Sequence, residues 1–391
     1  MRAALYLPDS GSARLADQVV AGRPLALRPI VAAVRAGLGP VGVPSALRTP
    51  ALERAIARVR GLRDGVAWLG AGGPALPGKG SLVLLPAPAI VDARDLRALV
   101  AAGRDRAVLA ASAGAGAPVV LLPAKDVVPR AEALSAAQPL GAEIRQLASG
   151  PGVARVVGTH PWMAVAEDGD LTRAEARLYA AIGTDIDTGV DRFLHRQGSR
   201  VLTRGLVRTP VTPNQVSLGS LAIGLAAIWC AWRATPLSAA AGAVLYLLAC
   251  IVDHSDGEVA RLTFQESRFG AHLDWAIDTI IHAGLVLAMG VSSGGRALAV
   301  VGAVGAAGVI LSALFARWLP REIAIGEAVG GALRDMGNRD LFYVLLLAFV
   351  VLRWLAPAAL PVLALIVAAG SQTYWMACAA RIRAAQGAAR G

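Results

Sequence analysis

Cysteine is scarce in this sequence. The 391 residues contain three, Cys230, Cys250 and Cys378, and no pair has CxxC spacing. All three fall within long apolar runs, so we expect them to behave as small core residues, and no disulfide framework is implied. The start also lacks the features of a signal peptide, because its apolar run is short and ends at Pro8 and Asp9. We expect no cleavage there.

Lysine is nearly absent, although the chain is strongly basic. The net charge is +11 and the pI about 10.6, and Lys79 and Lys125 are the only lysines. No nucleic-acid-binding motif accompanies this charge, so we interpret it as attraction to anionic lipid and to phosphate. We interpret both lysines as solvated loop residues, with a nucleotide pocket as the alternative.

Long apolar runs are missing from the first 183 residues and frequent after Pro213. A content of 55% hydrophobic residues and a mean hydropathy of +0.56 are too apolar for an ordinary soluble protein. The pattern predicts an all-α transmembrane domain over residues 212–391, joined to residues 1–183 by a basic amphipathic juxtamembrane segment at 184–211. Six spans are expected, at 214–232, 237–261, 268–290, 297–319, 341–355 and 359–380.

Residues 1–183 have the pattern of an α/β domain. Short β-type runs alternate with charged helical segments, which favours a doubly wound, largely parallel sheet with helices on both faces. The expected strands are 3–7, 41–43, 82–85, 107–110, 119–122 and 154–157. The expected helices are 27–36, 50–60, 93–102 and 130–147.

Arginine placement indicates an orientation in the membrane. With both termini cytoplasmic, three outside turns hold only Arg233, Arg296 and Arg353, which satisfies the positive-inside rule. Arginines at every fourth position from Arg192 to Arg208 predict an amphipathic helix at the membrane surface. The cytoplasmic side then carries Arg192, Arg196, Arg200, Arg204, Arg208, the connection 261–268, Arg317, Arg321, Arg334, Arg339, Arg381, Arg383 and Arg390.

Four aspartates recur at helical spacing inside this apolar half. With the small residues beside them they form two sets. The members of the first set are spaced i, i+3, i+4 and i+7, and those of the second i, i+4 and i+8, so each set lies along one helix face. An aspartate at the centre of a membrane helix costs about 2.5–3.5 kcal/mol, so four uncompensated ones would cost on the order of 10 kcal/mol. A cation is therefore expected between them. The first set is Asp253, Asp256, Gly257 and Ala260, followed by Arg261, and the second is Gly270, Asp274 and Asp278.

These residues resemble the signature of the CDP-alcohol phosphatidyltransferases, DxxDGxxAR, eight residues, then GxxxDxxxD. The resemblance implies that Asp253, Asp256 and Asp274 bind Mg²⁺ or Mn²⁺, with two ions per site, and that Asp278 is metal neighbour and general base. The alternative is that these intramembrane polar residues satisfy each other. The implied nucleotide-binding residues are Asn214, Gly257, Ala260, Arg261 and Gly270; for Asn214, capping the first span with Thr212 is an equal alternative.

Acceptor recognition has a weaker signal. A phosphorylated acceptor needs guanidinium groups, and a cluster of arginines between the fourth and fifth spans would supply them. Topology alone also predicts this cluster. His282, one turn beyond Asp278, is interpreted as a core histidine rather than as part of the site. The arginines are Arg317, Arg321, Arg334 and Arg339.

The N-terminal domain resembles a degenerate nucleotidyltransferase. The opening PDSGSARL matches a glycine-rich turn at Gly11, Arg14 and Leu15, but its second glycine and the following lysine are missing. After the 82–85 strand, where the fold's metal-binding aspartate is expected, the chain has Pro86 and Ala87. Such domains are fused to this membrane domain in enzymes that make and use CDP-inositol. We interpret this one as an inactive relic serving as scaffold or dimerisation module.

Together these features predict an integral membrane transferase of phospholipid biosynthesis. It would move a substituted phosphate from a CDP-alcohol, either CDP-diacylglycerol or a CDP-polyol, to a hydroxyl acceptor and release CMP. An inositol-phosphate type lipid is favoured by the fused domain. Membrane lipid and a second copy in a homodimer are the expected partners, with the site on the cytoplasmic side. The alternatives are a bifunctional enzyme that also makes its CDP-alcohol from CTP and, more distantly, an ion-coupled transporter.

Overall fold

The structure is a computed structural model that describes residues 2–70, 80–102, 106–110, 116–160, 162–182, 195–318 and 339–388. Two compact units make up the chain. The first comprises Met1–Gly183 together with Leu262–Gln265, and the second comprises Thr184–Arg261 together with Glu266–Gly391.

The first unit is built on a seven-stranded sheet. Its strand order is β10-β8-β9-β6-β1-β4-β5, and all neighbouring strands are parallel except those that pair with β9. The strands are β1 (Ala3–Tyr6), β4 (Val41–Pro44), β5 (Val66–Leu69), β6 (Ser81–Pro86), β8 (Ala107–Ala110), β9 (Val119–Pro123) and β10 (Ala154–Val157). Two short antiparallel strand pairs lie outside it: β2 (Val19–Val20) with β3 (Arg23–Pro24), and β7 (Ala89–Ile90) with β11 (Met163–Ala164).

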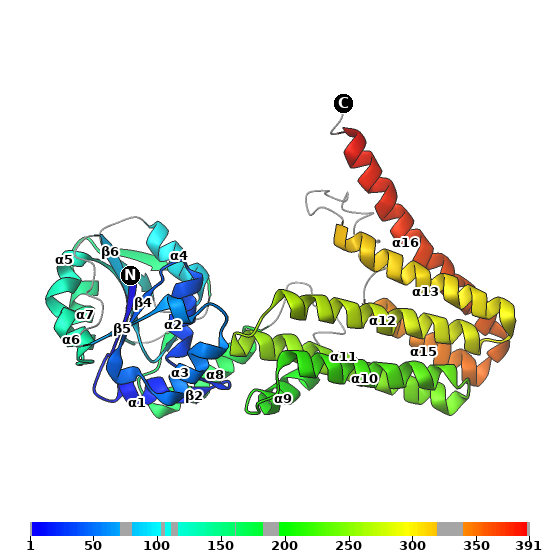
Figure 1. Cartoon of the computed structure of the whole chain (residues 1–391), viewed down its shortest axis with the longest axis horizontal. Coiled ribbons are helices and arrows are strands. Elements are labelled where there is room, and N and C mark those ends of the chain that lie inside the picture. The colour runs from blue at the N-terminus through cyan, green and yellow to red at the C-terminus, as the bar shows by residue number, and fades with distance from the viewer. Residues whose placement is uncertain are drawn as a thin grey trace. The chain divides into compact units, whose positions relative to one another are not determined.

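Helices cover both faces of this sheet. Successive side chains of a strand point to opposite faces, and both faces are apolar here, so each needs a covering layer. Leu5 of β1 belongs to the same apolar core as side chains of the helices α2, α3 and α4, whereas Tyr6 belongs to the core that contains side chains of α5, α6 and α7. Figure 1 shows these two groups of helices on opposite sides of the sheet. Both cores are apolar. The helices are α1 (Ser12–Asp17), α2 (Leu27–Arg35), α3 (Pro50–Arg58), α4 (Ala93–Ala101), α5 (Ala124–Val127), α6 (Ala131–Ser135), α7 (Gly141–Ala148) and α8 (Asp168–Ala180).

The expected α/β fold is confirmed, with differences in detail. The helix expected over 130–147 is two helices, α6 and α7, separated where Ala137 adopts a positive φ of 55°. Strand β5 and helix α8 were not expected from the sequence. Of the two lysines, Lys125 is exposed on the short helix α5, and Lys79 lies outside the described residues.

Four residues that are distant in sequence, Leu262–Gln265, complete the first unit. The Arg23 Nε donates to the Thr263 carbonyl oxygen at 3.3 Å. Phe264, which adopts a positive φ of 59°, lies between the guanidinium groups of Arg28 and Arg35, 5.5 and 5.4 Å from its ring centroid. Cation–π contacts of this kind stabilise an aromatic ring on a polar surface.

The second unit is helical. Among the described residues, five helices are long and apolar enough to cross a membrane, and the apolar part of α15, Phe342–Leu355, is shorter. A helical membrane-type region is therefore confirmed, with the fifth expected span the short one. The helices are α9 (Arg196–Leu206), α10 (Pro213–Trp232), α11 (Pro236–Thr263), α12 (Arg268–Ser292), α13 (Gly295–Trp318), α15 (Arg339–Leu355) and α16 (Leu360–Ala388).

Glycines bring some of these helices into close contact. A Cβ atom on Gly290 of α12 would lie 2.4 Å from the Gly302 Cα of α13, so neither position accepts a side chain without movement of the backbone. On α10, a Cβ on Gly224 would lie 2.4 Å from the Ile281 Cδ1 of α12. Small residues allow the close helix packing that membrane bundles depend on. Helix α12 is thereby held between α10 and α13.

Candidate active site

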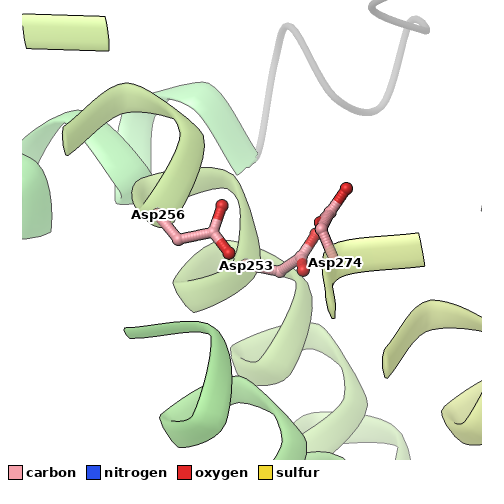
Figure 2. Close-up of side chains that lie close together, drawn as sticks. All are labelled: Asp253, Asp256 and Asp274. Atoms are coloured by element: carbon pink, nitrogen blue, oxygen red, sulfur yellow. The ribbon is translucent and has the colours of Figure 1, made fainter. Parts of the chain in front are cut away.

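Three aspartates meet where α11 and α12 lie side by side. Asp253 and Asp256 are one turn apart on α11, and Asp274 is on α12 (Figure 2). Each contributes one carboxylate oxygen to a group whose atoms all lie within 4.8 Å of one another. Asp253 and Asp256 are only 7% and 8% exposed, and Asp274 is half-buried. Like charges this close repel strongly in a medium of low dielectric constant, so the arrangement favours a bound cation.

The donor set fits a hard divalent cation. All three donors are carboxylate oxygens, the ligand type preferred by Mg²⁺ and Mn²⁺, and no described cysteine or histidine belongs to the group. Because Asp274 is only half-buried, the group is accessible from one side. Such a site can keep substrate oxygens in the coordination shell of the ion.

Asp278 lies one helical turn beyond Asp274 on α12 and is half-buried. Its carboxylate is not among the oxygens grouped within 4.8 Å. A group at this distance along the helix is suited to act on a substrate atom next to the metal site. Its role as general base and metal neighbour stays a prediction.

Ser217 is a site residue that the sequence did not reveal. Its hydroxyl donates to the Asp256 carboxylate and is 2% exposed. The position follows from the start of α10, where Thr212 forms a capping box with Gln215 and Pro213 occupies the first turn. The signal available in the sequence was a serine three residues after Asn214 in an otherwise apolar span. A hydrogen bond to a carboxylate ligand fixes its orientation.

Two pairs of the expected nucleotide-binding residues lie together. A Cβ on Gly270 would be 3.3 Å from the Asn214 Oδ1, and a Cβ on Gly257 would be 3.3 Å from the Arg261 Nη1. The lack of a side chain at each glycine thus leaves room for these polar groups beside the helix backbone. Ala260 is half-buried on the same face of α11 as Asp256 and Gly257. Binding of a nucleotide by these five residues stays a prediction.

The acceptor arginines are only partly described. The Arg317 guanidinium lies 4.9 Å from the ring centroid of Trp275, the residue after Asp274, and Arg317 is exposed. Arg339 begins α15, but its side chain, like all of Arg321 and Arg334, lies outside the described residues. Arg317 is therefore the member of the expected cluster whose side chain can be placed, against α12 at Trp275.

The histidine near the site is engaged in the core of the helical unit. The His282 Nε2 forms a 2.7 Å hydrogen bond with the Tyr246 hydroxyl, and its ring packs on Phe342 with centroids 4.1 Å apart. A second pair, His195 and Tyr343, forms another 2.7 Å hydrogen bond. The interpretation of His282 as a core histidine agrees with these contacts.

Comparison with known proteins identifies the helical half. Residues 210–379 match the family model for CDP-alcohol phosphatidyltransferase, and this part of the chain is therefore a CDP-alcohol phosphatidyltransferase domain. Helices α10 to α13 and both halves of the aspartate motif lie within the matched range. The resemblance expected from the aspartate motif is confirmed.

The chain is also similar to proteins named "Bifunctional IPC transferase and DIPP synthase". It is 34% identical over 182 residues to the one from Rubrobacter xylanophilus, which is 45% of this chain and 40% of that protein. It is 30% identical over 121 residues to the Archaeoglobus fulgidus protein and 31% identical over 122 residues to the Thermococcus kodakarensis protein, covering 24% and 27% of them. The chain thus spans less than half the length of the curated relatives it matches.

Proposed function

We propose that this chain is an integral membrane transferase that moves a substituted phosphate from a CDP-alcohol to a hydroxyl acceptor and releases CMP. The observation that carries the proposal is the meeting of Asp253, Asp256 and Asp274 within the matched domain. Among described residues this acidic group lies on α11 and α12 alone, which favours a transferase site over the ion-coupled transporter.

The aspartates and their neighbours have distinct roles in this proposal. Asp253, Asp256 and Asp274 would hold two Mg²⁺ or Mn²⁺ ions, which would supply positive charge for the diphosphate and the leaving CMP. Asp278 accepts the proton of the acceptor hydroxyl while the hydroxyl oxygen of the acceptor attacks the phosphorus atom. Asn214, Gly257, Ala260, Arg261 and Gly270 bind the nucleotide, and Arg317, Arg321, Arg334 and Arg339 bind the acceptor.

Placement in the membrane follows from charge. Arginines concentrate at one end of the proposed spans, so both termini and the aspartates are assigned to the cytoplasmic side. CDP-linked substrates are soluble at their nucleotide end and reach the site from that side. A homodimer in membrane lipid is the proposed assembly.

The names of the relatives favour one alternative, a bifunctional enzyme that also makes its own CDP-alcohol. Two features of the first unit oppose it. Pro86 and Ala87, at the end of β6 where a metal-binding carboxylate is required, are buried and apolar. In the glycine-rich turn, the Gly11 N–H and the Ser12 hydroxyl both donate to the Asp9 carboxylate, at 2.9 and 2.8 Å. A triphosphate needs free backbone N–H groups, and Asp9 would repel it.

The test of the transferase is Asp256→Asn in purified full-length protein. This change removes a ligand charge but almost no volume, so we expect CMP release to be abolished while the folded protein is retained. CMP release is measured with candidate CDP-alcohols and labelled acceptors, with and without excess chelator. Undiminished wild-type turnover in excess chelator would contradict the assignment of a divalent metal. Full activity of Asp256→Asn would contradict the assignment of the aspartate group as the active site.

A further inference from the structure

A buried carboxylate outside the metal site joins α11 to α9. Glu258 is 1% exposed, and its two oxygens accept hydrogen bonds from three side chains of α9. The donors are the Arg196 Nη1 at 2.8 Å, the Ser199 hydroxyl at 2.9 Å and the Thr203 hydroxyl at 2.7 Å. These donors follow one another at i, i+3 and i+7, so they form one face of α9. All three of these hydrogen bonds come from a single helix.

This contact corrects the expected surface position of one arginine, Arg196. The arginines at every fourth position predict a basic stripe facing the membrane surface, but Arg196 is 5% exposed and pairs with Glu258, whereas the apolar Val201 is 71% exposed. The sequence pattern misses this because the partner of Arg196 is 62 residues away. The face of α9 that carries Arg196, Ser199 and Thr203 is therefore internal, whereas Arg204 is exposed.

Helix α11 presents opposite faces to α9 and to the metal site. At 100° per residue, Ile251, Ser255 and Glu258 share one face, and Asp253, Asp256, Gly257 and Ala260 lie about 180° away. The first face packs closely on α9: a Cβ on Gly198 would lie 3.1 Å from the Ile251 Cγ2, and the Ser255 hydroxyl donates to the Ser199 carbonyl at 3.4 Å. Rotation or displacement of α11 away from α9 would move the metal-binding aspartates directly.

The same contact fixes a third element of the site. Helix α9 ends at Leu206 and α10 begins at Pro213, so the position of α9 restricts where the start of α10 lies. That start carries Asn214, beside Gly270, and Ser217, which donates to Asp256. Glu258 therefore links α11 to α9, and through α9 it affects the start of α10, which carries Asn214 and Ser217.

We propose that Glu258 is a positioning residue for metal binding. By holding α9 against the back of α11, it fixes Asp253 and Asp256 in the geometry that completes the site with Asp274. The inference rests on the proposed function, because it takes these three aspartates as ligands. It assigns to the charged pair of Glu258 and Arg196 a role in ion affinity that is separate from its contribution to stability.

The first variant is Glu258→Gln, studied as purified full-length protein. Glutamine keeps the size of the side chain but turns an N–H donor toward a group of donors, and it removes the negative charge that faces the Arg196 guanidinium. The readout is Mn²⁺ affinity, measured from the electron paramagnetic resonance signal of free Mn²⁺ without substrate. We expect the dissociation constant to rise by about tenfold or more, the usual effect of removing a residue that orients metal ligands.

A paired variant separates positioning from stability. Replacing a buried ion pair by apolar residues is often neutral for stability, so R196M/E258M is expected to unfold at a temperature near that of the wild type. If Glu258 positions the ligands, this variant still binds Mn²⁺ weakly. Recovery of both thermal stability and Mn²⁺ affinity would overturn the proposal, as would wild-type affinity in Glu258→Gln.

Two further variants keep the outcome clear. Arg353→Met removes a different hydrogen bond, which Arg353 donates to the Ser292 carbonyl at 2.7 Å. Ser292 ends α12, about 27 Å along the helix from Asp274. It should leave Mn²⁺ affinity unchanged. If Glu258→Gln does not fold, Thr203→Val removes one donor without changing charge and should weaken Mn²⁺ binding by a smaller factor. Absence of Mn²⁺ binding by the wild type would instead count against the proposed function.

Discussion

Asp95 of the first unit and the aspartate group of the second unit show two opposite surroundings for buried carboxylates. In the first unit Asp95 is 2% exposed and accepts from the backbone N–H groups of Thr159 and His160, at 3.0 and 3.2 Å. In the second, Asp253 and Asp256 are nearly as buried, yet they lie beside a third carboxylate rather than against backbone donors alone. A carboxylate that binds loop N–H groups stabilises a fold, whereas carboxylates that crowd together destabilise it unless a cation binds. The crowded set is therefore the better indicator of function.

The largest expected effect that sharpens this comparison is at Asp278, in the second unit. As a general base it acts in the chemical step, so Asp278→Asn should lower the rate of CMP release by at least about a hundredfold while CDP-alcohol still binds. Rates and binding constants are measured on the same purified protein. Thr279→Val is the matched control, because the Thr279 hydroxyl is already bonded to the Trp275 carbonyl at 2.8 Å. Equal loss of binding and rate would make Asp278 primarily a metal ligand.

Much of this arrangement was predictable because its signals are local. The strands at 107–110 and 154–157 have the bounds expected, since short runs that contain valine lie between turn residues there. The aspartates were predictable as a site because helical spacing alone places Asp253 and Asp256 on one face. Their meeting with Asp274 was expected through the family resemblance.

What was not predictable depends on contacts distant in sequence. The break between α6 and α7 depends on the positive φ of Ala137, which no residue type announced. Arg196 reads as a surface arginine until Glu258 is placed beside it. Likewise, Ser217 gains its role only when α10 packs beside Asp256. Each of these features belongs to tertiary structure, which overrides local pattern.

A smaller effect is expected in the first unit, at Asp170 of α8. Burial raises the pKa of this carboxyl. The backbone N–H donors of Ala166 and Glu167 and the Arg173 guanidinium together lower it by more, so the pKa is below its ordinary value. A lowered folded-state pKa gives stability that is present above the unfolded pKa and is lost as pH falls through the folded one. Asp170→Asn should therefore destabilise α8 by about 1–2 kcal/mol at neutral pH.

Hydrogen–deuterium exchange of α8 peptides measures this effect. At pH 7 the variant should exchange faster than the wild type, and the difference should shrink as the pH is lowered below about 4. Asp168→Asn on the same helix is the control, because the Asp168 pair with Arg14 is more than half exposed and contributes little. A difference that persists unchanged at low pH would contradict the assignment to the Asp170 carboxylate.

The smallest expected effect is none, and it tests the comparison most directly. Purified full-length protein supplied with CTP, Mg²⁺ and sugar or polyol phosphates should release no pyrophosphate, because Pro86 and Ala87 offer no metal ligand and Asp9 occupies the glycine-rich turn. The same preparation must release CMP from a CDP-alcohol and an acceptor, which shows that the protein is active. Pyrophosphate release at a rate comparable to that of CMP would make the protein bifunctional, and buried carboxylates would then fail as a guide to which unit is catalytic.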